Sequence, residues 1–232
     1  MSSPYWNLLG RAITVPIVFW MLTATNQASL DQARSPKSEQ QVALEAEIRR
    51  ADALSVVGKT REAEKILENL TKEHNGPVLR KILLGGQDFT LCYWAAFTLG
   101  ILHSSKDFRA LLDASSSHDL LVRKCAFIGL AEHSRKGLSA EEKGALRSRI
   151  ELVVESRDWQ LASGAIRVLD KFAERQDSSI LESMLVNLSP RNDGWSLAAR
   201  ILGRVDGAKA KSTKDEKLRQ LEEDIEIVKR FL

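Results

Sequence analysis

The sequence predicts an all-α fold in which antiparallel helix pairs stack into a right-handed α-solenoid. Hydrophobic residues make up 44% of the 232 positions, enough to bury a sizeable core. Two observations of composition favour helices: aromatic residues make up only 6%, and Leu and Ala are abundant. With five prolines in the chain, this Ala- and Leu-rich balance suits helix packing better than a β-sandwich. The third observation is a segment that recurs four times. Helix pairs that each bury one face on a neighbour form a continuous stack.

The recurring segment begins with aspartate, continues as an Ala-rich helix and ends near Leu-Gly. Its copies start at Asp88, Asp119, Asp158 and Asp193, which are 31, 39 and 35 residues apart. These spacings lie within the range of helix-pair arrays. Aspartate at the first position caps free backbone N–H groups of the second helix of each pair. We therefore predict that these four aspartates are structural caps.

The second copy carries a more specific pattern, in which Asp is followed by Val-Arg, then Ala, then Leu. The residues that carry it are Asp119, Val122, Arg123, Ala126 and Leu130. This order resembles the second helix of a HEAT repeat. The resemblance covers roughly residues 77–206, although the other three copies lack the arginine. It implies about four HEAT-like repeats in an armadillo-type (ARM-like) superhelix.

The segments between the copies fit as the first helices of the pairs. They start near Pro77, Lys106, Ser139 and Ser178. Ser139 and Glu142 form the sequence pattern of a capping box, which predicts a helix start at that point. Each pair is amphipathic alone, so its stability is expected to come from stacking on its neighbours.

Two further helical segments flank the repeats. Residues 41–76 divide at Gly58 into two amphipathic segments, and the second resembles the second helix of a tetratricopeptide repeat (TPR). We expect a TPR-like helical hairpin there. Residues 207–232 read as a charged linker followed by a helix that caps the last repeat. That helix has the a/d spacing of a coiled coil, so the alternative is weak self-association through residues 218–232.

The N-terminus has a different composition from the rest of the chain. Ala12–Ala24 is an uncharged apolar run preceded by Arg11, and its length suits a signal peptide better than a full membrane span. We predict that residues 1–25 are a signal peptide or a short membrane anchor and that 26–40 are a polar linker. An uncleaved segment would contact the membrane through residues 8–25. The expected location is membrane-anchored or exported, periplasmic or otherwise extracytoplasmic. The alternative is cytoplasmic, with the segment buried as a first helix.

Charge and motifs narrow the function classes. The 34 basic and 31 acidic residues give a net charge of +3, too balanced for the basic stripe of a typical nucleic-acid binder. The sequence holds no phosphate-binding glycine loop, paired-cysteine metal motif or nucleophile elbow. Cys92 and Cys125 lie in apolar helical stretches and are predicted to be buried free thiols. No catalytic, cofactor-binding or metal-binding residue is predicted, and no cofactor is expected.

The expected function is therefore that of a non-catalytic HEAT-like scaffold that binds a protein partner, which the sequence does not identify. A competing hypothesis comes from the HEAT-like alkylpurine DNA glycosylases, which use Trp and Asp side chains on a solenoid surface. Asp158 with Trp159, and Asp193 with Trp195, supply those residue types, but the predicted capping role already explains the aspartates. A HEAT-like phycobilin lyase is the third hypothesis, and it has no motif in this sequence.

Overall fold

The computed structural model describes residues 37–86, 88–188 and 193–230, and every regular element within these ranges is helical. The prediction of an all-α fold is confirmed. The chain divides into two units, Met1–Lys37 and Ser38–Leu232. The predicted targeting segment and nearly all of the predicted linker lie outside the described residues. Among the described helices, none combines the length and apolar character needed to cross a membrane.

The predicted N-terminal hairpin consists of α2 (Glu39–Val56) and α3 (Thr60–Leu70), which pack against each other. Helix α2 begins two residues inside the expected linker, because the Ser38 hydroxyl accepts a hydrogen bond from the Gln41 amide at 3.2 Å and caps it. Gly58 separates the two helices with a φ of 77°, a left-handed conformation that favours glycine.

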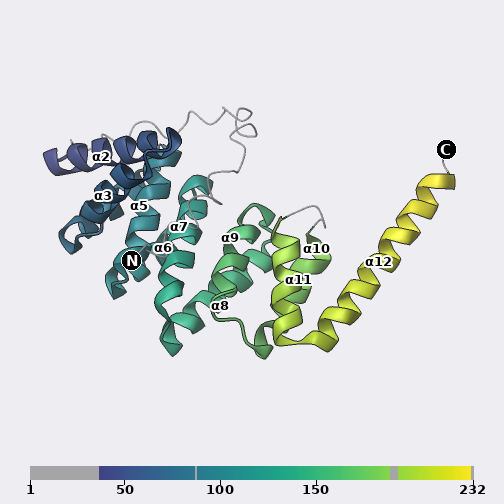
Figure 1. The fold of residues 1–232 in the computed structure, drawn as a ribbon. Coiled ribbons are helices and arrows are strands. Elements are labelled where there is room, and N and C mark those ends of the chain that lie inside the picture. The colour runs from purple at the N-terminus through teal and green to yellow at the C-terminus, as the bar shows by residue number, and fades with distance from the viewer. Residues whose placement is uncertain (1–36, 87, 189–192, 231–232) are drawn as a thin grey trace. The chain divides into compact units, whose positions relative to one another are not determined.

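The four recurring segments form α5, α7, α9 and α11, which pack side by side in this order (Figure 1). Their bounds are Phe89–Leu102, Leu120–His133, Trp159–Leu169 and Asp193–Val205. Every copy of the repeat noted in the sequence is therefore a helix. Because each of these helices contacts the next, the four helices form one continuous layer.

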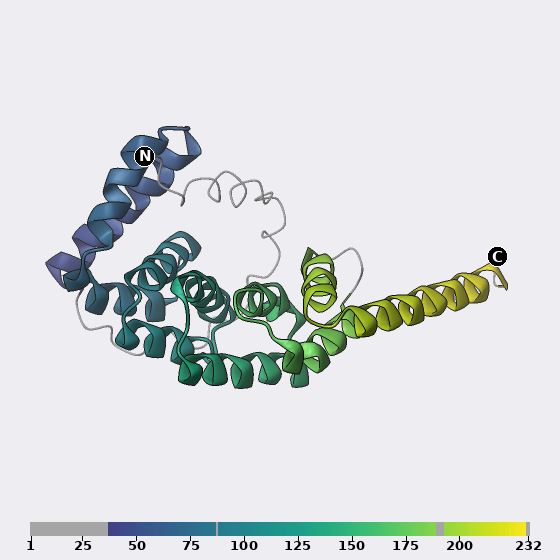
Figure 2. The same ribbon diagram turned by 60° about the horizontal axis from the view of Figure 1, so that its bottom comes forward.

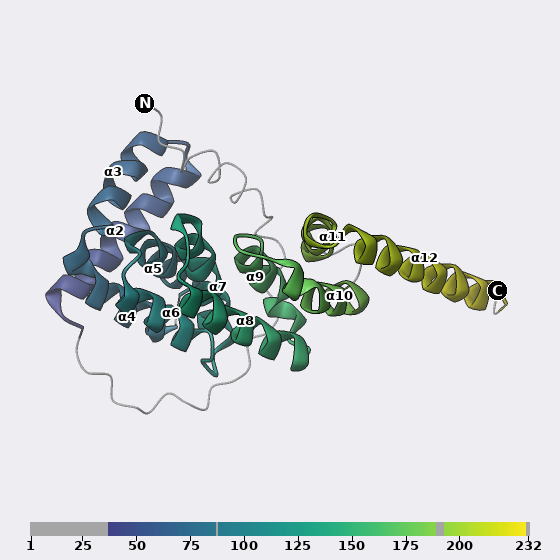
Figure 3. The ribbon, with the colours of Figure 1, turned by 90° about the horizontal axis from the view of Figure 1, so that it is seen from below.

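The segments between them form a second layer, seen beside the first in Figures 2 and 3. It contains α4 (Gly76–Gly85), α6 (Ser105–Ala114), α8 (Ala140–Glu155) and α10 (Ser178–Asn187). Short 3-10 turns lie at Glu73–Asn75, Ser134–Lys136 and Arg175–Asp177. The core lies between the layers and includes fully buried Leu79, Leu99, Phe127 and Ile150. This packing is compatible with a helical repeat.

The predicted capping box at the start of α8 is confirmed. The Ser139 hydroxyl accepts a hydrogen bond from the Glu142 amide at 3.2 Å, and the Glu142 carboxylate accepts one from the Ser139 amide at 2.8 Å. Two backbone N–H groups at this helix start are satisfied by one pair of side chains. The helix start could be placed from four consecutive residues because both bonds are local.

The C-terminal region differs from the expected charged linker and separate capping helix. Residues 207–217 belong to one continuous helix, α12 (Gly207–Arg230). Its alanines, lysines and glutamates are good helix formers, and the Asp206 carboxylate accepts a hydrogen bond from the Lys209 amide at 3.2 Å. Helix α12 packs on α10 and α11. The side chains of the predicted coiled-coil seam lie outside the described residues, so self-association stays a prediction.

Candidate interaction surface

Two of the predicted caps lie at helix starts and bind backbone amides. The Asp88 carboxylate accepts a hydrogen bond from the Leu91 amide at 3.2 Å at the start of α5. The Asp119 carboxylate accepts one from the Leu121 amide at 2.7 Å at the start of α7. Each carboxylate satisfies one of the free N–H groups of its helix and lies where the helix dipole favours negative charge.

The other two predicted caps differ from this pattern. Asp158 precedes α9, but its carboxylate makes no bond to the amides of that helix. It accepts instead a hydrogen bond from Nη1 of Arg123 at 2.7 Å. Asp193 is the first residue of α11, and its side chain is outside the described part. Asp158 therefore connects α9 to α7 across the stack.

The remaining signature residues divide between core and surface. Val122, Ala126 and Leu130 of α7 are buried. Arg123 remains partly exposed and reaches Asp158. The signature thus includes three packing residues and one residue that joins adjacent helix pairs.

The Arg123–Asp158 ion pair is one of a series that joins each helix pair to a neighbour. Each pair joins an arginine on one helix with an aspartate in the adjacent repeat. The pairs are Arg49–Asp88, Arg80–Asp107, Arg123–Asp158, Arg147–Asp177 and Arg204–Asp170. Arg123 and Arg147 each lie 2.7 Å from their partner's oxygen. Ion pairs between successive helix pairs favour one arrangement of each pair on its neighbour.

A row of aromatic side chains runs along one face of α5. Phe89, Tyr93 and Phe97 are spaced four residues apart, so they share a helix face. The ring centroids of Phe89 and Tyr93 are 5.9 Å apart, and those of Tyr93 and Phe97 are 6.2 Å apart with rings nearly parallel. Phe89 is 55% exposed, and the other two rings are half-buried. We call these three residues the aromatic row.

The base of the aromatic row is fixed by Trp94, which is buried. Its ring lies edge-on to both Tyr93 and Phe97, with centroids 5.3 and 5.7 Å away. Its indole N–H donates a hydrogen bond to the Asp52 carboxylate of α2 at 3.0 Å. The polar edge of this indole is therefore satisfied inside the protein, and the buried ring packs beneath Tyr93 and Phe97.

The charges near the row come from three other helices: Arg167 of α9, Glu132 of α7 and Asp52 of α2. Burial raises the pKa of the Tyr93 phenol, nearby Arg167 of α9 opposes that shift, and Glu132 of α7 adds to it. Tyr93 is therefore a neutral hydrogen-bonding group at neutral pH rather than a nucleophile or base. The row is an apolar strip with charges of both signs at its margins.

The described residues offer no centre for metal or thiol chemistry. No group of three His, Cys, Asp or Glu side chains is arranged to hold a metal ion in the described part of the chain. Cys92 and Cys125 are buried free thiols, as predicted. A hydrogen bond with Cys92, together with burial, raises the pKa of the Cys125 thiol, which makes it a poor nucleophile.

Comparison with known proteins supplies no assignment: no family model matches the chain, and a search of curated proteins finds no similar sequence. The aromatic row was not singled out from the sequence. Its spacing of four residues was visible there, but the spacing alone does not distinguish an exposed strip from a buried one.

Proposed function

We propose that this protein is a non-catalytic scaffold with a HEAT-like, right-handed α-solenoid fold, and that the aromatic row on α5 binds a protein partner. The two helix layers support this fold, as do the Arg–Asp pairs that recur between neighbouring repeats. Stacks of this kind present extended surfaces, and binding rather than catalysis is their common use.

One observation carries the proposal: three adjoining aromatic rings lie on one helix face, with Phe89 more than half exposed. Exposed aromatic clusters are costly in water and are enriched at the centres of protein interfaces. The matching partner is a protein segment with apolar side chains that cover the three rings. Acidic or polar groups at its edge would meet Arg167, which is exposed.

The test is site-specific crosslinking of the full-length protein in its native host. A photo-crosslinking phenylalanine analogue replaces Phe89 in one version and Leu152 of α8, which is 51% exposed, in the control. We expect a dominant protein adduct from position 89 that is absent from position 152. Tyr93→Ala should reduce the yield of that adduct, because it removes the middle ring of the row. Identical adducts from both positions, or a yield that Tyr93→Ala does not change, would contradict the proposal.

We further propose that the protein is membrane-tethered or exported through its N-terminal segment. The support is the uncharged run Ala12–Ala24, preceded by Arg11 and followed by polar sequence. Full-length protein should fractionate with membranes or appear as a form shortened by roughly the length of a signal peptide. Replacing Val18 and Phe19 by Asp should release it, because central charges oppose insertion. Wild-type protein that stays soluble and uncleaved would end this proposal.

A further inference from the structure

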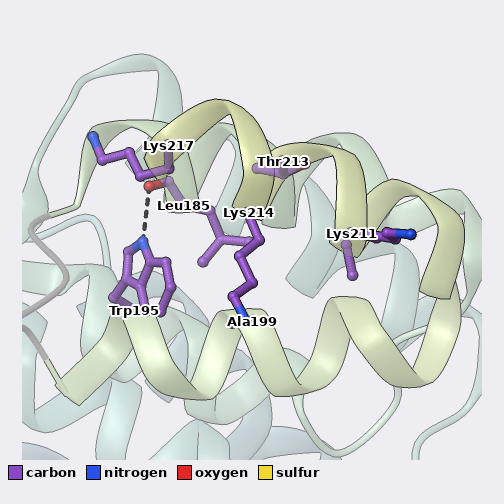
Figure 4. A pocket seen from close by; sticks show the side chains of 8 residues that line it. Leu185, Trp195, Ala199, Lys211, Thr213, Lys214 and Lys217 are labelled. Atoms are coloured by element: carbon purple, nitrogen blue, oxygen red, sulfur yellow. Dashed lines mark hydrogen bonds between the residues drawn. The ribbon is translucent and has the colours of Figure 1, made fainter. Parts of the chain in front are cut away.

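A cavity lies where the last three helices meet, apart from the aromatic row. It has a volume of about 320 Å³ and is lined by residues of α10, α11 and α12 (Figure 4). Four of them are apolar: Leu185, Trp195, Ala199 and Ala210. Ala199 of α11 and Ala210 of α12 have side chains too small to fill the space between these helices.

The wall formed by Trp195 is apolar in spite of its indole nitrogen. The indole N–H donates a hydrogen bond to the Leu185 carbonyl at 3.1 Å, drawn as the dashed line in Figure 4. The polar edge of the ring is thereby satisfied within the protein. The ring that lines the cavity can therefore contact a ligand through its apolar surface.

The polar lining of the same cavity is predominantly cationic. Lys211, Lys214 and Lys217 line it together with Thr213, and none of its described lining residues is acidic. Figure 4 shows Lys214 extending from α12 towards α11 beside Trp195, while Lys211 and Lys217 point away on either side. Lys217 donates to the Val186 carbonyl at 3.0 Å. The Thr213 hydroxyl is also bonded, to the Lys209 carbonyl at 2.9 Å. Lys214 is thus the cation best placed at the cavity.

We propose that this cavity binds a single-chain acyl carboxylate, with the chain against Trp195 and Leu185 and the carboxylate at Lys214. An apolar interior with one cation at its edge matches a ligand that is apolar along its body and anionic at one end. A methylene group occupies about the 30 Å³ of a water molecule, so the cavity holds on the order of ten chain carbons. Decanoate is therefore the probe.

The test is titration of the full-length protein with decanoate by calorimetry, below the concentration at which the probe forms micelles. We expect one binding site, with decanol and butyrate binding more weakly because one lacks the charge and the other most of the chain. Lys214→Gln should weaken decanoate binding about tenfold, as expected for losing one charge-assisted hydrogen bond. Ala199→Phe should abolish it by filling the cavity.

The matched control is Lys65→Gln on α3, an exposed lysine that makes the same change in net charge and should leave the affinity unchanged. Vesicles of anionic phospholipid distinguish a free acyl anion from a lipid surface. Binding to vesicles without binding to decanoate would overturn the proposal. So would equal affinity for decanol and decanoate, or an affinity that neither Lys214→Gln nor Ala199→Phe alters while circular dichroism shows both variants folded.

Discussion

The contact between α5 and α7 differs from the contact between α11 and α12, although α5 and α11 derive from the same repeated segment. A Cβ atom added at Gly100 would lie 2.3 Å from the Gly129 carbonyl oxygen, and one added at Gly129 would lie 2.4 Å from that of Ala96. The backbones of α5 and α7 thus approach each other directly. On α11, a Cβ at Gly203 would meet nothing within 4 Å, and the neighbouring cavity between α11 and α12 is open.

The difference shows that one sequence pattern can have two structural roles. Leu-Gly ends both the first and the fourth copy of the repeat, at Gly100 and Gly203. In α5 the glycine permits close approach to the backbone of α7. In α11 no neighbouring backbone comes close to it. Close packing at Gly100 leaves no room for a ligand between α5 and α7. Gly203 is exposed, and the cavity that we assign to an acyl anion lies elsewhere on the same helix, at Trp195 and Ala199.

Alanine at the two kinds of glycine should therefore have opposite effects, and this is the largest difference we expect. Gly129→Ala forces a methyl group against the Ala96 backbone and should lower the free energy of unfolding by about 3 kcal/mol. Gly203→Ala meets open space in a helix and should raise it by about 0.5–1 kcal/mol. Urea unfolding followed by circular dichroism measures both. If both variants shift the midpoint in the same direction, the contrast between the two glycine positions is wrong.

The Arg–Asp pairs give a second, smaller contrast between the middle of the stack and its C-terminal end. Arg147 donates two hydrogen bonds, at 2.7 and 3.2 Å, to the Asp177 carboxylate, whose side chain is only 1% exposed. Arg147→Met should cost about 2 kcal/mol, because it leaves a buried carboxylate without this partner.

The matched substitution is Arg200→Met on α11. Arg200 is 70% exposed and lies 3.5 Å from Asp170, so its loss should cost less than about 1 kcal/mol. The same urea titration compares the two variants. A larger loss from Arg200→Met than from Arg147→Met would show that the pairs at the C-terminal end are the stronger ones.

Local features of this fold could be predicted from the sequence, because the bonds that make them span only a few residues. The hydrogen bonds that Asp88 and Asp119 accept come from backbone amides two or three residues along the chain. The two bonds of the capping box at Ser139 span three residues. Asp158 has the same local pattern but binds Arg123, 35 residues away. Asp88 has both kinds of partner, since Arg49 of α2 lies 2.7 Å from its other carboxylate oxygen. No local pattern reveals which distant partner an aspartate takes.

The candidate sites depended on tertiary packing and could not be derived in this way. The spacing of Phe89, Tyr93 and Phe97 was visible, but their exposure depends on which face of α5 its neighbours cover. The cavity is lined by Ala199 of α11 and Ala210 of α12, and their proximity depends on how these two helices pack. The sequence predicts a linker for the first half of α12, because its residues are mostly polar. Its contacts with α10 and α11, which identify it as part of a packed helix, appear only in the folded protein.

The region where α5 packs closely on α7 contains a buried histidine, and the C-terminal helices do not. His133 ends α7 and is buried, with its ring stacked on that of His103 at a centroid distance of 4.0 Å and beside Phe108. Its Nε2 lies 3.1 Å from the Glu142 carboxylate, to which the neutral ring donates. Burial lowers the pKa of His133 and nearby His103 adds to this, whereas Glu142 and Asp107 oppose it. Helices α10 to α12 contain no histidine.

The last and smallest effect we expect is a loss of stability in mild acid that originates at His133. The folded protein takes up this proton less readily than the unfolded chain, whose histidine has the ordinary pKa of 6.5. The contribution of His133 is therefore fully present above that value, and it is lost as the pH falls from there towards the lowered pKa.

Glu142 adds a second loss of stability at lower pH. Although burial raises its pKa, hydrogen bonds from Ser139 and His133 lower it overall from 4.5. Urea midpoints measured from about pH 7.5 to about pH 5.5 should fall for the wild type and fall less for His133→Gln. The exposed residue His118 provides the control, because His118→Gln should follow the wild-type curve. If His133→Gln retains the full slope, the acid sensitivity arises elsewhere, and the tight contact between α5 and α7 is not its source.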